Sequence, residues 1–259
     1  MHVNRLLEQL GPALPEQLVG LYLCGSAARG TAGPHSDIDL LAVTRCALDP
    51  AQREALITAL LEVSGWSGHR KSFPEAADRR PVEFSVIVRD HRDRRDSAPQ
   101  VDFQYGEWLR AEVTAGELPQ PFEDPDVLLL LEDARQNHRT LFGPDLQEFL
   151  AAPPPALLTR ACRDALPALV EELHTDTRNT LLTLARMVGT VTTGQIVSKH
   201  RAAVMAAGEL PQAEGALLLR AAEEHRGETS VDWGQEQVPA QRAADRLASR
   251  IRGAPAFFA

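Results

Sequence analysis

Hydrophobic residues follow two different spacings along this chain, and the change between them divides it into two regions. In the first region, three short apolar runs have the length and composition of buried strands, at residues 18–24, 37–43 and 80–88. Residues 3–10 and 49–65 carry apolar positions at helical spacing, which predicts one helix before the first strand and one after the second. The first region is therefore expected to form a small sheet with helices.

Beyond residue 119 the apolar spacing is helical to the end of the chain. We expect helices at residues 124–143, 156–173, 176–191, 193–208, 211–227 and 238–253. The segment 103–110 is interpreted as a short helix beside the sheet, and residues 90–100 as a surface loop. Three consecutive prolines at 153–155 interrupt the helical pattern. The sequence thus predicts an α+β protein, with a small mixed-sheet domain at 1–150 followed by an all-helical bundle domain at 151–259.

Composition and charge narrow the possible function classes. A chain of 259 residues with 44% hydrophobic residues can form two domains, each with its own core. Its net charge of −9 argues against a general nucleic-acid-binding protein and favours a small cationic partner. No segment has the ~20 apolar residues that cross a bilayer or the apolar stretch of a secretory signal, so we expect no membrane partner. The three cysteines lack CxxC spacing, which indicates neither a zinc site nor a disulfide framework and favours a reducing, cytoplasmic location.

Small and acidic residues lie at the ends of the first two predicted strands. The first strand stops at Gly25 and Ser26, where small residues allow a sharp turn and a close approach of the backbone to a ligand. Asp37 and Asp39 open the second strand, and residues two apart on a strand point to the same face. Two neighbouring carboxylates repel each other unless a cation lies between them, and hard oxygen ligands suit Mg²⁺. The stretch therefore indicates a site for magnesium and a nucleoside triphosphate.

Glu83 lies in the otherwise apolar third strand, where burying a lone carboxylate would be costly without a cation or a substrate. If the third strand neighbours the second, Glu83 joins Asp37 and Asp39 at one edge of the sheet. One of the three can then act as a base on an attacking hydroxyl. Each feature also has a structural interpretation, a tight turn for Gly25 and Ser26 and a solvated strand end for the two aspartates. Three acids on otherwise apolar strands favour a function.

Three separated blocks carry a family resemblance. Gly25-Ser26, Asp37-Ile38-Asp39 and Glu83 resemble the signature of polymerase-β-like nucleotidyltransferases. A narrower resemblance, to the aminoglycoside (3'')(9) adenylyltransferases, is carried by LYLCGSAARGTAGPHSDIDLL (21–41), QYGEWLR (104–110) and NTLLTLARMVGTVTTGQIVSKHRAA (179–203). The blocks fall in the family's order, and the similarity covers nearly the whole chain.

Membership of that family implies an N-terminal nucleotidyltransferase domain and a C-terminal helical domain that bind Mg-ATP and an antibiotic between them. Such an enzyme moves AMP onto a hydroxyl of streptomycin or spectinomycin and releases pyrophosphate. The resemblance implies Mg²⁺ ligands at Asp37 and Asp39, and at Glu83 a base that also binds the metal. Nucleotide-binding roles are implied for Gly25, Ser26, Ser36, Asp126, Arg186 and Lys199. Substrate-binding positions implied in the same way are Trp108, Asp176 and Asn179.

The segment before Asp176 departs from the family members that accept streptomycin. Those members have a tryptophan and an aspartate there, whereas this chain has ALPALVEELHTD (165–176), with no tryptophan and with Glu171 and Glu172 as the nearest acids. Asn179 stands in place of a family histidine, and His225 in place of a family tyrosine. We therefore favour spectinomycin, the smaller substrate, over streptomycin. We also expect a monomer, because the fused helical domain completes the cleft within one chain.

Two other functions stay open from the residues. A nucleotidyltransferase of the same fold could act on another acceptor, such as a protein, an RNA end or a metabolite. A non-catalytic nucleotide-binding regulator is the second alternative, although the intact set of Asp37, Asp39 and Glu83 argues against it. The identity of the product formed from Mg-ATP and each drug would separate the three.

Overall fold

The computed structural model describes residues 3–33, 36–89 and 100–254, with side chains from Leu6 onward. The surface loop predicted at 90–100 lies outside this part of the chain except for its last residue. The chain divides into two compact units, called here the sheet unit (Met1–Val127 and Asp133–Ala151) and the helical unit (Leu128–Glu132 and Ala152–Ala259). Whether the predicted boundary at 150–151 separates independently folding domains stays a prediction.

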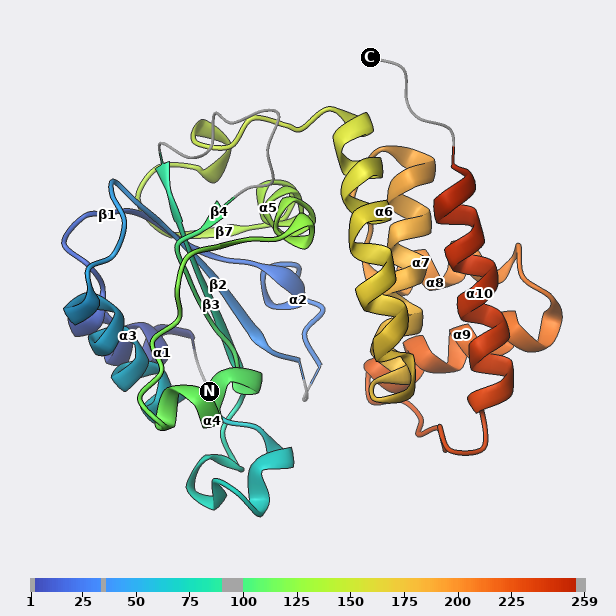
Figure 1. The fold of residues 1–259 in the computed structure, drawn as a ribbon, viewed down its shortest axis with the longest axis horizontal. Helices are drawn as coiled ribbons and strands as arrows, with labels where there is room; N and C mark the ends of the chain where they lie inside the picture. The colour runs from blue at the N-terminus through green and yellow to red at the C-terminus, as the bar shows by residue number, and fades with distance from the viewer. Residues whose placement is uncertain (1–2, 34–35, 90–99, 255–259) are drawn as a thin grey trace. The chain divides into compact units, whose positions relative to one another are not determined.

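A five-stranded mixed sheet forms the centre of the sheet unit, with the strand order β5-β3-β2-β1-β7 (Figure 1). Its strands are β1 (Leu18–Leu23), β2 (Ile38–Thr44), β3 (Val82–Val88), β5 (Phe103–Tyr105) and β7 (Arg139–Phe142). β2 and β3 run parallel, and the other neighbouring pairs are antiparallel. A separate two-stranded sheet pairs β4 (Gln100–Val101) with β6 (Phe122–Glu123). The mixed sheet predicted from the sequence is confirmed.

Short helices flank this sheet. Those described in the sheet unit are α1 (Val3–Leu10), α2 (Gly25–Ala28), α3 (Pro50–Val63), α4 (Arg110–Thr114) and α5 (Pro125–Gln136), the middle of which belongs to the helical unit. α1 and α3 pack on one face of the sheet (Figure 1), where Leu6, Leu56 and Leu60 are fully buried in one core with the alternating apolar positions of β2 and β3. α3 begins as the sequence predicts, because Asp49 and Gln52 form a reciprocal capping box.

The helical unit is a bundle built around one central helix. Its main helices are α6 (Pro155–Glu171), α7 (Thr177–Thr193), α8 (Lys199–Ala207), α9 (Gln212–His225) and α10 (Gln237–Gly253). α7 contacts the other four, and leucines and alanines from all five helices share one buried core. The predicted all-helical bundle is confirmed. In the described part of the chain, no helix combines the length and hydrophobicity needed to cross a membrane.

The helix predicted at 124–143 is wrong in its last part. α5 ends at Gln136, Asn137 has the non-helical dihedrals φ −141° and ψ 77°, and Arg139–Phe142 form β7, which pairs with β1. Most positions of β7 are exposed, so this short edge strand has no alternating apolar pattern to mark it in the sequence. Pairing with β1, rather than local preference, decides its structure.

The helix predicted at 103–110 is wrong at its start. Phe103–Tyr105 form β5, which pairs with β3, and a 3₁₀ turn at Glu107–Leu109 (η5) leads into α4. Phe103 and Tyr105 are fully buried on one face of the strand. Two alternating aromatic residues are too short a pattern to separate a strand from a helix turn.

Two further predicted helices are displaced along the chain. Thr193 is the last residue of α7, Gly194 takes the left-handed conformation that ends the helix, and α8 begins at Lys199 after an N-cap at Ser198. A short helix, α2, begins directly at Gly25, the glycine of the turn.

Candidate active site

The parallel pairing of β2 and β3 places two acidic residues side by side. In the register of these strands Asp39 is the partner of Glu83, and the flanking residues on both strands are buried. Asp37 lies just before β2 and, like Asp39 and Glu83, is partly exposed, whereas Ile38 between the aspartates is 1% exposed. The expectation that the third strand neighbours the second is confirmed.

Gly25 lies directly against the carboxylate of Asp39. A Cβ added to Gly25 would come within 1.8 Å of Asp39 Oδ2, and the φ of +61° at this glycine is one that other residues rarely adopt. The backbone holds the same arrangement, because the N–H of Cys24 donates to the carbonyl of Asp39 at 2.8 Å. Glycine is therefore required here for the close approach, and the turn and the acidic pair form one structure.

Ser36 is held in place by Arg80. The Ser36 hydroxyl accepts the N–H of Gly33 at 2.9 Å, and its carbonyl accepts Arg80 Nε at 2.6 Å. A second nitrogen of Arg80 donates to the carbonyl of Gly33 at 2.9 Å. Since Arg80 lies just before β3, its guanidinium ties the segment that precedes β2 to the segment that precedes β3. Arg80, which is not among the site residues predicted from the sequence, thus positions Ser36.

An ion pair anchors α2, which carries Ser26, to α5. Arg29, directly after α2, donates to Asp133 of α5, and their side chains are only 17% and 10% exposed. The thiol of Cys24 lies in the same region, where burial and the charges of Asp39 and Asp133 raise its pKa far above the usual range. Cys24 is therefore a neutral, buried thiol, and not a nucleophile.

The acidic residues of the sheet unit offer carboxylate oxygens, the ligands that Mg²⁺ prefers. Within residues 3–33, 36–89 and 100–254, no group of three or more His, Cys, Asp or Glu side chains is already assembled to hold a metal ion. The fit of Asp37, Asp39 and Glu83 to magnesium rests on their donor chemistry and on the β2–β3 register. Magnesium binding stays a prediction.

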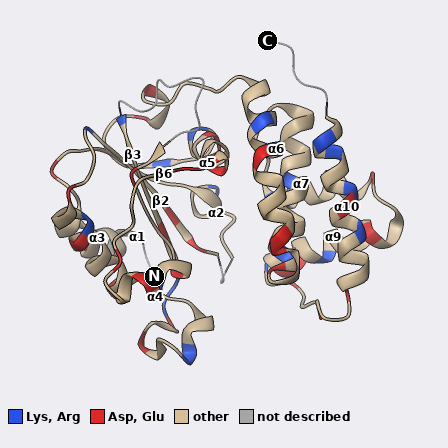
Figure 2. Cartoon of the chain, in the orientation of Figure 1, with Lys and Arg blue, Asp and Glu red and all other residues tan. Residues whose placement is uncertain are grey.

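Basic side chains surround His225 in the helical unit. They are Lys199, Arg178, Arg226 and Arg186. Burial and these charges lower the pKa of His225 to about 4, so its imidazole is neutral at physiological pH. Lys199, at the start of α8, also donates to Asn179 Oδ1 on α7. Basic positions occur along α6, α7 and α10 as well (Figure 2). Arg226 is paired with Glu228, and Lys199, Arg178 and Arg186 form a concentration of positive charge suited to an anion.

We expect the protein to lose stability as the pH falls from about 6.5 towards 4, in part because of His225. Its pKa is about 6.5 in an unfolded chain and about 4 in the folded protein. Within this window the unfolded chain binds a proton that the folded protein does not, which favours unfolding. Urea unfolding at pH values above and inside the window measures the loss. The variant His225→Gln should show a smaller loss, and an equal one would mean that other groups are responsible.

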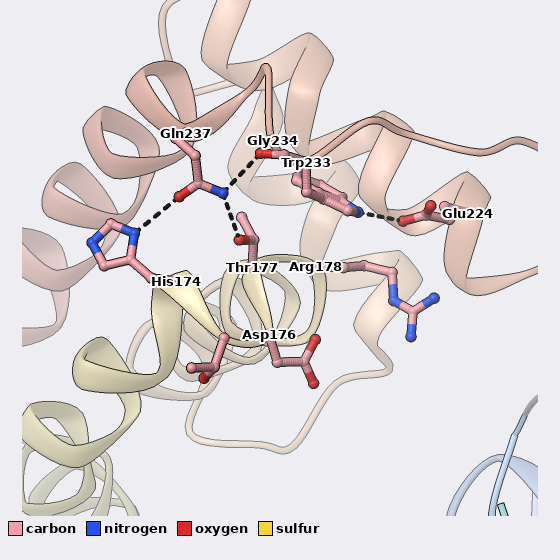
Figure 3. Close-up of a pocket in the computed structure, with 9 residues that line it drawn as sticks. His174, Asp176, Thr177, Arg178, Glu224, Trp233, Gly234 and Gln237 are labelled. Atoms are coloured by element: carbon pink, nitrogen blue, oxygen red, sulfur yellow. Dashed lines mark hydrogen bonds between the residues drawn. The ribbon is translucent and has the colours of Figure 1, made fainter. Parts of the chain in front are cut away.

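A pocket of about 400 Å³ lies beside Asp176 in the helical unit (Figure 3). It is lined by His174, Thr175, Asp176, Thr177, Arg178, Glu224, Trp233, Gly234 and Gln237. One wall is held by hydrogen bonds, since Trp233 Nε1 donates to Glu224 at 2.7 Å and Gln237 Nε2 donates to the carbonyl of Trp233 at 2.7 Å. Asp176 caps α7 by accepting the N–H of Asn179 at 3.2 Å. The volume is in the range of small-molecule sites.

The predicted ligand-contacting residues Trp108 and Asp126 belong to the sheet unit and are exposed. Trp108 is 56% exposed, and its ring covers Gly106, where an added Cβ would come within 2.1 Å of the indole. Asp126 lies in the first turn of α5, whose N-cap Asp124 accepts the N–H of Asp126 at 2.8 Å. The indole of Trp108 is thus available to contact a ligand.

The structure gathers the predicted residues into two groups and leaves the rest apart. Asp39, Glu83 and Gly25 meet in the sheet unit, and Asn179, Lys199 and Arg186 in the helical unit. The site residues predicted from the sequence did not include four charged residues of these surroundings, Arg29, Arg80, Asp133 and Arg178. Of these four, only Arg178 could have been found from the sequence, because it lies on the same predicted helix as Arg186. The ion pair of Arg29 could not, because its partner Asp133 lies 104 residues away.

Both ends of the chain match known protein families. Residues 3–67 match a nucleotidyltransferase domain, and residues 148–250 match the aminoglycoside adenylyltransferase C-terminal domain. A spectinomycin 9-adenylyltransferase of Staphylococcus aureus is 41% identical over 216 residues, which cover 83% of this chain and 81% of that protein. An aminoglycoside (3'')(9) adenylyltransferase of Escherichia coli is 34% identical over 239 residues, which cover 92% of this chain and 83% of that protein.

The fold as a whole also has a solved counterpart. A crystal structure of a spectinomycin adenyltransferase from Enterococcus faecalis, with ATP and spectinomycin, is similar over 96% of this chain and 98% of that chain. The TM-score of the comparison is 0.86, and the two sequences are 27% identical. The likeness therefore includes both the sheet unit and the helical unit.

Proposed function

Because this chain belongs to the aminoglycoside adenylyltransferase family, we propose that it transfers AMP from ATP to a hydroxyl of spectinomycin and releases pyrophosphate. The observation that carries the proposal is the register that pairs Asp39 with Glu83 beside the turn at Gly25. A metal ligand, a base and a close-approaching backbone then lie in one place. The solved relative holds ATP and spectinomycin, which supports these two substrates.

Glu83 serves as the base in this proposal. The drug hydroxyl oxygen forms a bond to the α-phosphorus of ATP as its proton passes to Glu83. The bond from the α-phosphorus to the oxygen that bridges to the β-phosphate breaks, and pyrophosphate leaves with that electron pair. The protein forms no covalent bond to either substrate, so the positions of the two reactants and the charge around them supply most of the catalysis.

Mg²⁺ would be bound by Asp37, Asp39 and Glu83. When bound, it neutralises the triphosphate and makes the α-phosphorus easier to attack. Ser26 on α2 and Ser36 would contact the phosphates, the first anchored through the Arg29–Asp133 ion pair and the second through Arg80. Gly25 would let the backbone approach the same phosphates, and Asp126 would lie near the nucleotide.

The basic cluster of the helical unit would supply positive charge that binds the triphosphate. Arg186 and Lys199 supply positive charge there, and Arg178 belongs to the same cluster. Lys199 is oriented by its hydrogen bond to Asn179 on the neighbouring helix. Removing the charge of Lys199 or Arg186 would then weaken ATP binding and slow the transfer.

Three features support spectinomycin as the acceptor. Asp176 borders a pocket of about 400 Å³ and would bind an ammonium or hydroxyl group of the drug, with Asn179 one turn further along α7. Trp108 would form an apolar wall. The segment before Asp176 lacks the tryptophan of streptomycin-accepting members.

Gly25→Ala should disable the site, and Gly30→Ala provides a matched control. Both glycines have positive φ, +61° and +68°, so each alanine costs about 1–2 kcal/mol of backbone strain. Only at Gly25 would the new Cβ collide with Asp39, because nothing lies within 4 Å of a Cβ at Gly30. Steady-state kcat should fall on the order of 10²-fold in Gly25→Ala and stay near that of the unaltered chain in Gly30→Ala. Equal losses would mean that strain alone is responsible.

The proposed function is tested with pure protein, Mg-ATP and each drug separately. Mass spectrometry identifies adenylylated drug, and a coupled assay measures pyrophosphate. We expect spectinomycin to be modified and streptomycin to be left unchanged. Modification of both drugs would contradict the choice of spectinomycin alone, and modification of neither would indicate a different acceptor.

A further inference from the structure

Glu107 is the centre of a buried polar network in the sheet unit. Its carboxylate, in a residue 7% exposed, accepts hydrogen bonds from Ser64, Tyr105 and Arg110. Arg110 donates to both carboxylate oxygens, at 2.7 and 3.1 Å, as in a bidentate pair. His69 Nε2 lies 3.0 Å from the carboxylate but not in hydrogen-bonding geometry. Because both oxygens of the Glu107 carboxylate accept hydrogen bonds, the carboxylate is held in one position.

Ser64 connects this network to strand β3. Its hydroxyl donates to Glu107 Oε1 at 2.5 Å and accepts the backbone N–H of Val82 at 2.9 Å. Val82 is the first residue of β3 and directly precedes Glu83. Because a serine hydroxyl has one hydrogen, donating it to Glu107 fixes where the oxygen can accept. Arg110 also donates to the Ser64 carbonyl at 2.7 Å, so both ends of the serine are held.

The same network holds the turn η5 that carries Trp108. Glu107 is the first residue of η5 and Arg110 directly follows it, so the bidentate pair closes across the turn. On the other side the indole lies over Gly106, where an added Cβ would come within 2.1 Å of the ring. The backbone of η5 is therefore held by the Glu107–Arg110 pair and by the hydrogen bond from the N–H of Leu109 to the carbonyl of Gly106.

Glu107 remains ionised within the network. Burial alone would raise the pKa of its carboxyl, but the hydrogen bonds from Arg110 and Ser64 outweigh burial and hold the pKa below its usual value. Burial raises the pKa of Tyr105, so its phenol stays a hydrogen-bond donor. An ionised acceptor strengthens each of these hydrogen bonds, including the one that orients Ser64.

We propose that Glu107 is a positioning residue of the transfer reaction. Through Ser64 it fixes the first amide of β3, and with it the carboxylate of Glu83, and through η5 it fixes Trp108. This inference rests on the proposed function, because it takes Glu83 as the base and Trp108 as a wall of the drug site. Glu107 acts through these residues and does not itself contact the reacting atoms.

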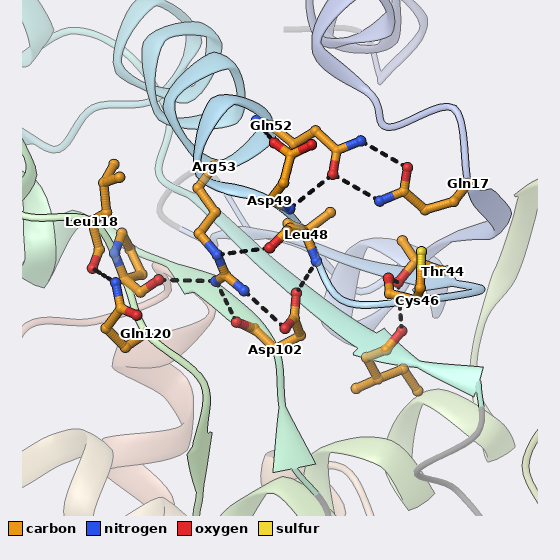
Figure 4. A network of polar contacts seen from close by, with 12 residues as sticks. Gln17, Thr44, Cys46, Leu48, Asp49, Gln52, Arg53, Asp102, Leu118 and Gln120 are labelled. Atoms are coloured by element: carbon orange, nitrogen blue, oxygen red, sulfur yellow. Dashed lines mark hydrogen bonds and ion pairs between the residues drawn. The ribbon is translucent and has the colours of Figure 1, made fainter.

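A second buried arginine–carboxylate pair offers a matched control (Figure 4). Asp102 accepts Arg53 Nη2 at 2.8 Å and the N–H of Leu48 at 2.9 Å, and both charged residues are less than 9% exposed. Leu48 follows the end of β2, and the N–H of Asp102 donates to Val86 late in β3. This pair therefore stabilises the sheet unit at the opposite end of the two strands from the acidic pair.

The test compares Ser64→Ala, Glu107→Gln and Asp102→Asn in the full chain, by kcat, KM and Tm. Ser64→Ala should lower kcat on the order of 10-fold to 100-fold while KM for ATP changes by less than about twofold. Glu107→Gln should lower kcat similarly and also raise KM for spectinomycin several-fold, because η5 loses its support. Asp102→Asn should keep kcat within about twofold of the unaltered protein, even if its Tm falls as much as that of the other two variants.

Two further readouts separate positioning from stability. The double variant of Ser64→Ala and Glu107→Gln should have a kcat no lower than that of the less active single variant, because both residues act through one chain of hydrogen bonds. Hydrogen exchange at the amides of Val82 and Glu83 should be faster in Ser64→Ala and unchanged in Asp102→Asn. If Glu107→Gln does not fold, Ser64→Ala, which removes one neutral hydroxyl, carries the same test.

The outcomes distinguish this inference from the proposed function. If kcat falls no more in Ser64→Ala than in Asp102→Asn at an equal loss of Tm, the network only stabilises the fold and the inference is wrong. If the unaltered protein fails to modify spectinomycin, the proposed function is wrong. Amide exchange then tests whether Glu107 still positions the start of β3. Faster exchange confined to the first residues of β3 would then support positioning by Glu107, and unchanged exchange would overturn it.

Discussion

Glu83→Gln is expected to lower kcat for adenylyl transfer by about 10²–10⁴-fold and to leave ATP binding within a few-fold of normal. Glutamine has nearly the same size and can occupy the same place in β3, where the neighbours Val82 and Phe84 are fully buried. It cannot accept the proton of the attacking hydroxyl. Steady-state kinetics with spectinomycin measure the first effect, and calorimetric titration with Mg-ATP measures the second.

The control for this variant is Ser85→Ala, two residues along the same face of β3. Ser85 is 5% exposed and is paired with Leu41, beyond the acidic pair. It should keep near-normal kcat, which would exclude a general effect of altering the strand. Near-normal turnover in Glu83→Gln itself would mean that the base has been assigned to the wrong residue.

The second large effect is expected for Asp39→Asn, which should reduce kcat/KM on the order of 10²–10³-fold. An amide removes one negative charge from the proposed metal site while keeping the shape that Gly25 packs against. The affinity for Mg²⁺ should therefore fall, and activity should become dependent on much higher magnesium concentrations. A titration of activity against free Mg²⁺ measures the shift.

Asp133→Asn is the control for Asp39→Asn, since Asp133 influences the same buried thiol, Cys24, but pairs with Arg29. The Asp133→Asn variant should be less stable and should hold α2 less firmly, but its activity should depend normally on magnesium. An unchanged magnesium titration in Asp39→Asn would contradict its role as a metal ligand.

The sequence predicted those parts of the fold in which burial leaves a long pattern. β1, β2 and β3 are apolar runs, and the helices of the bundle have long apolar faces, so each was predicted close to its observed place. β5 and β7 were predicted as helix because they have three and four residues and obtain their structure from pairing with β3 and β1. Strands that short carry too little periodicity to identify them.

The candidate site also contains residues that the sequence predicts and residues that it does not. Asp37, Asp39 and Glu83 stand out because acids are costly on apolar strands, and the pairing of Asp39 with Glu83 agrees with that expectation. The residues that hold them in place gave no such signal. Ser64 and Glu107 are 43 positions apart, and the basic residues around His225 come from several helices, so only packing brings them together.

Catalysis of AMP transfer to spectinomycin by the acidic pair of β2 and β3 can be tested directly. The most direct measurement is the mass spectrum of spectinomycin after incubation with Mg-ATP and either the unaltered protein or Glu83→Gln. We expect a product heavier by one adenylyl group with the unaltered protein, and unmodified drug with the variant over the same time. Unmodified drug in both reactions, or the same yield of product in both, would contradict it.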